Sequence, residues 1–95
     1  MRAVITARLV EQLRRAAPRA VEVWDTRQPG LVLRLRPSGH ASYGVRYGRT
    51  RRLTLGPAGV LTPEQARALA RAVLGDVARG TDPAAERRRR RAGTL

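Results

Sequence analysis

The chain has no cysteine, no lysine and no phenylalanine, and only 3% of its 95 residues are aromatic. Without cysteine it can form neither a disulfide framework nor a thiolate metal site. The core of this one small domain must be modest, because much of the apolar content is alanine, which buries little area. No apolar run is long enough for a membrane-spanning helix, and residues 1–20 lack the apolar segment of a signal peptide. We therefore expect a soluble intracellular domain.

Acidic residues are also scarce. The chain has 7 of them against 20 basic residues, all arginine, which gives a formal net charge of +13. Codon bias in a GC-rich genome accounts for the use of arginine in place of lysine, but it does not account for the excess of positive charge. An excess of this size on a small domain indicates a polyanionic partner. Nucleic acid is the usual partner, and an anionic membrane surface is the alternative.

Residues 31–55 carry the strongest periodic signal, LVLRLRPSGHASYGVRYGRTRRLTL. Apolar residues alternate there with polar or small residues, and side chains on a strand point to opposite faces in turn. The alternating runs are residues 31–36, 42–47 and 52–55. Turn-forming residues separate them at 37–39 and at Gly48. The pattern predicts a three-stranded antiparallel meander with one apolar face for the core and one arginine-rich face for a polyanion.

The arginine-rich face is the candidate binding surface, because no Asp or Glu occurs between Leu31 and Leu61. A merely solvated face would mix charges of both signs. The candidate DNA-binding residues are Arg34, Arg36, Ser42, Arg46, Arg49, Arg51, Arg52 and Thr54. Three of them, Arg34, Arg46 and Arg52, are expected at base edges, beside the two hydroxyl residues. The other three arginines lie nearer the strand ends and are expected at phosphates. The alternative is a solvated face whose arginines protect an exposed strand edge.

Residues 6–17 have apolar side chains at helical spacing, with Thr6 as a candidate N-cap and Pro18 ending the run. We interpret this segment as a short packing helix with solvated charges. A direct DNA contact from Arg14 or Arg15 is the less favoured alternative.

Residues 21–25, VEVWD, are typical of a short strand that precedes the meander. Glu22 and Trp24 would share the face opposite to the two valines. We expect Trp24 to cover the core or a sheet edge rather than to serve as a base-stacking platform. The Gln-Pro-Gly sequence that follows is a turn into the first strand of the meander.

The clearest helix runs from Thr62 to Gly80. Thr62 is the predicted N-cap, Pro63 occupies the first helical position, and Gln65 completes a capping box. Gly80 is suited to end the helix. The apolar stripe expected to pack on the sheet consists of Ala66, Leu69, Ala70, Val73, Leu74 and Val77. The arginines expected off that stripe are Arg67, Arg71 and Arg79.

These segments predict an α+β fold: a three- to four-stranded antiparallel sheet packed on one C-terminal helix, with a short N-terminal helix. The domain would span residues 1–83, and residues 84–95 would form a basic tail or linker. The tail holds five consecutive arginines, Arg87 to Arg91. Such a block either forms a nucleic-acid-binding arm or is a disordered or helical linker into further protein, and the two interpretations are compatible.

An ordered set of short motifs then resembles a known family. The matching segments are WDT at 24–26, PGL at 29–31, LRL at 33–35, PSG at 37–39, residues 43–47, the basic turn 49–52, LTLG at 53–56, Leu61-Thr62, Ala66-Arg67, Ala70, Ala78, Gly80, Asp82 and Pro83. Together they resemble the N-terminal arm-type DNA-binding domain of phage and genomic-island tyrosine recombinases (integrases). The resemblance covers about residues 5–83 and implies a small sheet, packed on one helix, that enters a DNA groove.

The resemblance implies double-stranded DNA as the partner, at arm-type sites flanking a recombination core, together with other integrase protomers. It implies a bacterial cytoplasmic, nucleoid-associated protein without a cofactor, metal or small-molecule substrate. The catalytic domain of such integrases is missing here, and His40, Tyr43 and Tyr47 are not placed to act as a base or nucleophile. We therefore expect a non-catalytic module, either a fragment of an integrase or a short gene that kept the arm module.

Two other functions stay open from the sequence. An RNA-binding module could use a small sheet and a helix, but readers of single-stranded RNA usually expose aromatic side chains, and the tyrosines fall on the predicted buried side. A protein-interaction or assembly module of a recombination complex is the other alternative, because integrases act as tetramers.

Overall fold

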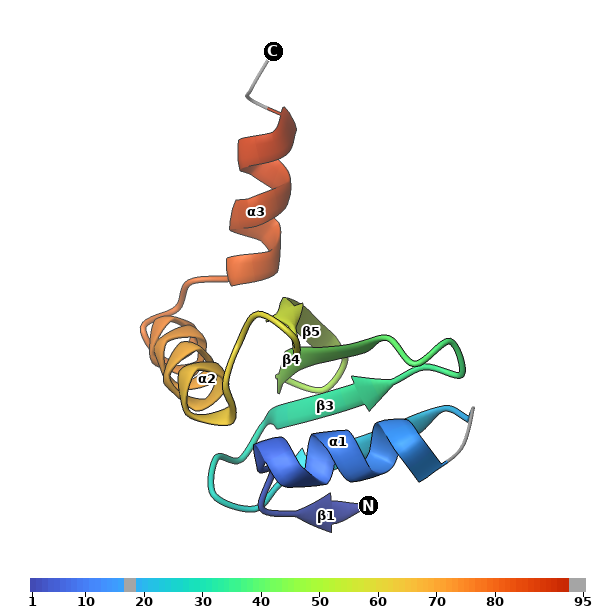
Figure 1. Ribbon diagram of the computed structural model, residues 1–95. Helices are drawn as coiled ribbons and strands as arrows, with labels where there is room; N and C mark the ends of the chain where they lie inside the picture. Colours follow the sequence, from blue (N-terminus) through green and yellow to red (C-terminus); the bar gives the residue numbers. More distant parts are fainter. Residues whose placement is uncertain (17–18, 93–95) are drawn as a thin grey trace.

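The computed structural model describes residues 1–16 and 19–92 (Figure 1). A sheet forms one layer and helices pack against one of its faces. The elements are β1 (Arg2–Ala3), α1 (Ala7–Ala16), β2 (Val21–Asp25), β3 (Leu31–Leu35), β4 (Ala41–Tyr47), β5 (Arg51–Pro57), α2 (Pro63–Ala78) and α3 (Pro83–Ala92). The predicted α+β class is confirmed, and so are the strand at 21–25 and the meander of β3, β4 and β5.

The sheet is larger than predicted and is mixed rather than antiparallel. Its strands follow the order β1-β2-β3-β4-β5; β2 to β5 are antiparallel neighbours, whereas β1 pairs with β2 in parallel. The amide of Trp24 donates to the Met1 carbonyl at 2.8 Å, and the amide of Thr26 donates to the Ala3 carbonyl at 3.0 Å. A strand as short as β1 has no alternation to detect, so its sequence did not reveal it.

The apolar face of the sheet is the core. Leu31, Leu33, Val23, Tyr43 and Val45 are each at most 1% exposed. This core also includes Val10 from α1 and Ala66 and Ala70 from α2. Both helices therefore cover the same face, which we call the inner face. Gly39 and Gly48 have φ values of 91° and 61° in the two turns of the meander, a region that favours glycine.

Helix α2 begins as predicted. The amide of Gln65 donates to the Thr62 hydroxyl at 3.1 Å, and the Thr62 amide donates to the Gln65 side-chain oxygen at 3.0 Å, so the capping box is formed. Gly80, with φ of 90°, follows the C-cap Arg79. Five residues of the predicted stripe pack on the core, namely Ala66, Ala70, Val73, Leu74 and Val77. Two positions differ from the prediction, because Leu69 is 41% exposed and Arg67 is only 4% exposed.

Arg67 is buried because a carboxylate of the sheet is its partner. Its Nε donates to Asp25 Oδ2 at 2.9 Å and its Nη2 donates to Asp25 Oδ1 at 3.1 Å and to the Ile5 carbonyl at 2.6 Å. Asp25 also accepts the amides of Ile5 and Gln28. Burial by itself would raise the pKa of Asp25, but the hydrogen bonds from Arg67 and these amides outweigh it and hold that pKa below its usual value. One buried ion pair thus joins α2, β2 and the segment after β1.

The expectation of one C-terminal helix is also corrected, because residues 83–92 form a second one, α3. Asp82 precedes it as an N-cap, with its carboxylate accepting the amide of Ala85 at 3.3 Å, and Pro83 occupies the first helical position. Helix α3 contacts β5 and α2 and extends beyond the body of the domain (Figure 1).

Candidate nucleic-acid interface

The sheet face opposite to α1 and α2, which we call the outer face, holds most of the predicted DNA-binding residues. Across β3 and β4, Arg34 is paired with Ser42. Across β4 and β5, Arg46 is paired with Arg52, and Thr54 is paired with Gly44. Paired residues point to the same face. The register therefore brings Arg34, Ser42, Arg46, Arg52 and Thr54 onto one surface, as the alternation predicted.

The structure places the three arginines expected at phosphates in different surroundings. Arg36 is exposed just after β3, with its amide donating to the His40 carbonyl at 2.9 Å, and Arg49 is exposed in the β4–β5 turn. Arg51 differs, because it pairs across the strands with buried Tyr47 and forms an ion pair with Asp82. Its side chain lies on the inner side of β5, so it does not belong to the outer face.

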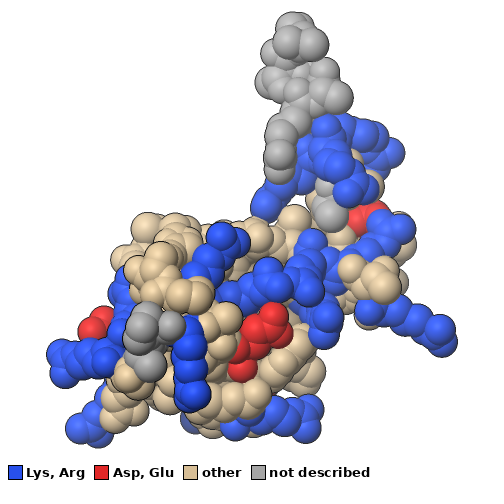
Figure 2. Space-filling view, turned by 90° about the vertical axis from the view of Figure 1, so that its right-hand side faces the viewer, with Lys and Arg blue, Asp and Glu red and all other residues tan. Residues whose placement is uncertain are grey.

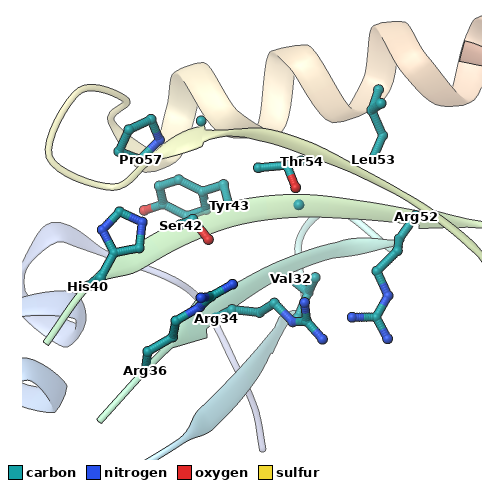
Figure 3. A pocket seen from close by; sticks show the side chains of 12 residues that line it. Val32, Arg34, Arg36, His40, Ser42, Tyr43, Arg52, Leu53, Thr54 and Pro57 are labelled. Atoms are coloured by element: carbon teal, nitrogen blue, oxygen red, sulfur yellow. The ribbon is translucent and has the colours of Figure 1, made fainter. Parts of the chain in front are cut away.

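A hollow of about 240 Å³ lies in the outer face over β3, β4 and β5. Arg34, Arg36 and Arg52 border it from one side, and the hydroxyls of Ser42 and Thr54 lie nearer its centre (Figure 3). The remaining residues that line it are Val32, His40, Tyr43, Gly44, Leu53, Gly56 and Pro57. The hollow therefore combines guanidinium donors with hydroxyls that can both donate and accept, as a site for polar groups on an anionic ligand requires.

Two outer-face arginines are held by residues of β2. Arg34 Nε lies 3.3 Å from Glu22 Oε1, and the Arg46 guanidinium carbon lies 5.2 Å from the centre of the Trp24 ring. An ion pair and a cation–π contact both restrict the rotamers of a long side chain. Trp24 is half-buried on the outer face, so it supports an arginine instead of covering the core or offering a free ring for stacking.

Glu22, Trp24 and His40 are charged or aromatic members of this surface that were not among the predicted site residues. The alternation of VEVWD placed Glu22 and Trp24 on one face, but only the antiparallel pairing of Glu22 with Arg34 shows that this is the outer face. His40 precedes β4 at the rim of the hollow (Figure 3). No periodic signal marks it, because its position depends on the bend of the β3–β4 hairpin.

The outer face carries little compensating negative charge. Four arginines of the outer face and its turns form no ion pair with the described residues. They are Arg36, Arg46, Arg49 and Arg52. Within residues 1–16 and 19–92, Glu22 is the acid that faces this surface, and it forms an ion pair with Arg34. Figure 2 shows basic side chains spread over the body of the domain and along α3, with few acidic ones between them. A bound polyanion would relieve their mutual repulsion.

Other kinds of site find no support in the part of the chain that the structure describes. Residues 1–16 and 19–92 contain no cluster of His, Cys, Asp or Glu that could hold a metal ion. Among the helices of these residues, none has the length and apolar character needed to cross a bilayer.

A small sheet with helices on one face and an uncovered cationic surface on the other defines a nucleic-acid-binding module. Residues 5–90 match the family model described as the Arm DNA-binding domain, and the chain belongs to this family. The match confirms the resemblance found in the sequence and establishes the domain as a DNA-binding module. It also extends past residue 83 into the basic segment. No curated protein and no solved structure gave a significant match to the chain.

Proposed function

We propose that this domain binds double-stranded DNA sequence-specifically at arm-type sites, as the N-terminal module of a tyrosine-recombinase integrase, with its outer face in the major groove. One observation carries this proposal. The register of β3, β4 and β5 gathers Arg34, Arg46 and Arg52 on a single uncovered surface. The family match supports DNA as the ligand, and the geometry of the face supports the groove.

The dimensions fit a major groove. Three strands about 4.8 Å apart span roughly 10 Å, and the major groove of B-DNA is about 12 Å wide and admits a β-ribbon. A guanidinium can donate two parallel hydrogen bonds to O6 and N7 of guanine. Arg34, Arg46 and Arg52 are the proposed base readers, with Ser42 and Thr54 beside them. Arg36 and Arg49 are the proposed phosphate contacts that set the register on the duplex.

The proposed role is that of a non-catalytic module. Tyr43 is 1% exposed, and its burial raises the pKa of its hydroxyl. Tyr47 is 6% exposed, and its hydroxyl donates to Asp82 Oδ1 at 2.7 Å. Neither side chain is placed as an exposed nucleophile. The arrangement supports binding and positioning of DNA, and recombination chemistry would come from a catalytic domain.

The salt dependence of binding tests the proposal. A preferred duplex is first selected from a random double-stranded pool, and its affinity for the full chain is then measured over a range of salt concentrations. If about five phosphates are neutralised, log affinity should fall against log salt with a slope of roughly −4 to −5. A flat response, or equal affinity for the selected duplex and a scrambled one, would contradict the proposal. Stronger competition by duplex RNA of the same length would favour an RNA-binding module instead.

A further inference from the structure

Helix α3 is the most basic element of the protein, and the outer face does not include it. Its sequence, PAAERRRRRA, contains a single acid, Glu86, which pairs with Arg89 at 3.1 Å. Like charges this close together lower the stability of a helix. A helix of this composition therefore needs stabilising contacts at its start.

The start of α3 is anchored through Asp82. The Asp82 carboxylate accepts the hydroxyl of Tyr47 at 2.7 Å and forms the ion pair with Arg51, so it binds the adjoining ends of β4 and β5. The same carboxylate caps α3 by accepting the amide of Ala85 at 3.3 Å. One half-buried acid thus fixes where α3 begins and joins it to the sheet.

A second contact brings α3 to the border of the outer face. Arg87 Nη1 donates to the carbonyl of Thr54 at 3.1 Å. Thr54 lies in β5, the last strand of the sheet, and its side chain lines the outer-face hollow. Arg87 therefore continues the cationic surface past the edge strand, and Arg88 and Arg89 follow it in the same helix. Figure 1 shows α3 extending away from the body of the domain.

We propose that α3 is a second DNA-binding element, held in place by Asp82, whose Arg88 and Arg89 contact phosphates of the same duplex next to the groove that the outer face occupies. Both side chains are exposed. A ten-residue helix is about 15 Å long, so α3 reaches well beyond β5. Phosphate contacts are independent of sequence, so α3 adds affinity and lengthens the footprint without changing which bases are read. This inference rests on the proposed function of the outer face.

The first experiment compares two charge-matched double variants of the full chain. Arg88→Ala/Arg89→Ala removes two arginines from α3, and the control Arg8→Ala/Arg71→Ala removes two exposed arginines from α1 and α2, on the inner side. The α3 variant should reduce the salt slope by about 2, with equal losses of affinity for the selected and scrambled duplexes. Its hydroxyl-radical footprint should shorten on one flank. A slope no lower than that of the control overturns the inference.

The second experiment separates a positioned helix from a merely charged one. Asp82→Ala removes a negative charge, so a simple charge effect would strengthen binding to DNA. If Asp82 holds α3 in place, the variant should instead bind more weakly and lose the protected flank. The matched control is Glu11→Ala, which removes an exposed acid from α1. Stronger binding by Asp82→Ala than by the control, with an unshortened footprint, contradicts the positioning role.

The two proposals can fail separately. If Arg46→Ala keeps full affinity and specificity, the outer face is not the reader. If Arg46→Ala loses binding while Arg88→Ala/Arg89→Ala behaves like its control, only the role of α3 is overturned. The Arg88 and Arg89 side chains are exposed, so this variant should fold even where Asp82→Ala does not, and melting temperatures check both.

Discussion

At the scale of single residues, arginine has three different uses in this protein. Arg67 is a buried structural cation, Arg51 helps to anchor a helix, and Arg46 is held over an aromatic ring on an open surface. The side chain is the same in each case, and the partner decides the role. A count of arginines therefore indicates a polyanionic ligand, but it does not identify which arginines bind it.

Arg46→Ala should weaken DNA binding and barely change the melting temperature, because the side chain is exposed and lies over the Trp24 ring. Loss of a bidentate base contact should cost about 1–3 kcal/mol and relax the preference at one base pair. Arg71→Ala is the charge-matched control on exposed α2 surface. Binding to selected and scrambled duplexes, with thermal melting, measures both effects. Unfolding with unchanged affinity would mean that the faces are assigned backwards.

Asp25→Asn should destabilise the domain by about 3–5 kcal/mol, because it leaves the buried Arg67 cation without its carboxylate. The pKa of Asp25 is lowered in the folded state, so its stabilising contribution is present above the ordinary value of 3.8 and is lost as the pH falls through the folded-state pKa. Denaturant unfolding at neutral and acid pH measures the free energy of unfolding and its loss in acid.

The exposed acid Glu11 provides the control for this titration. Glu11→Gln should leave the free energy of unfolding at neutral pH and its decline in acid nearly unchanged. An Asp25→Asn protein with the same acid sensitivity as the original chain would show that another carboxyl causes the loss.

At the scale of elements, a contact with the sheet decided which residues at the border of the α2 stripe are buried. Leu69 and Arg67 are both within the helix, and periodicity assigned Leu69 to the buried stripe. The structure exposes Leu69 and buries Arg67, because Asp25 on the inner face supplies an ionic partner and the small Ala66 and Ala70 allow close approach. An ion pair between distant segments leaves no periodic trace in either one.

Leu33→Ala should therefore destabilise the domain by about 2–5 kcal/mol, because Leu33 is 1% exposed in β3. Leu69→Ala should change stability by no more than about 0.5 kcal/mol, because Leu69 is 41% exposed. Urea denaturation of the two matched variants distinguishes the positions. A large loss of stability for Leu69→Ala would show that Leu69 packs on the sheet, as its periodicity suggested.

At the scale of the whole molecule, most acidic residues pair with arginines away from the outer face. Each of the 7 acidic residues of the chain forms an ion pair with an arginine. Apart from Glu22, these acids lie on the helices, on the inner face or at the start of α3. The outer face, its turns and α3 therefore hold part of the net charge of +13, which a duplex can neutralise.

The sequence by itself determined the local features. Alternation in β3 and β4 separates an apolar face from one that bears arginine, and the Thr62–Gln65 capping box marks where α2 begins. Both signals come from near neighbours in the chain. Tertiary structure decided what depends on distant partners. It decided the parallel pairing of β1, the burial of Arg67 against Asp25 and the anchoring of α3 by Asp82 to Tyr47. Each joins segments whose proximity arises only when the chain has folded.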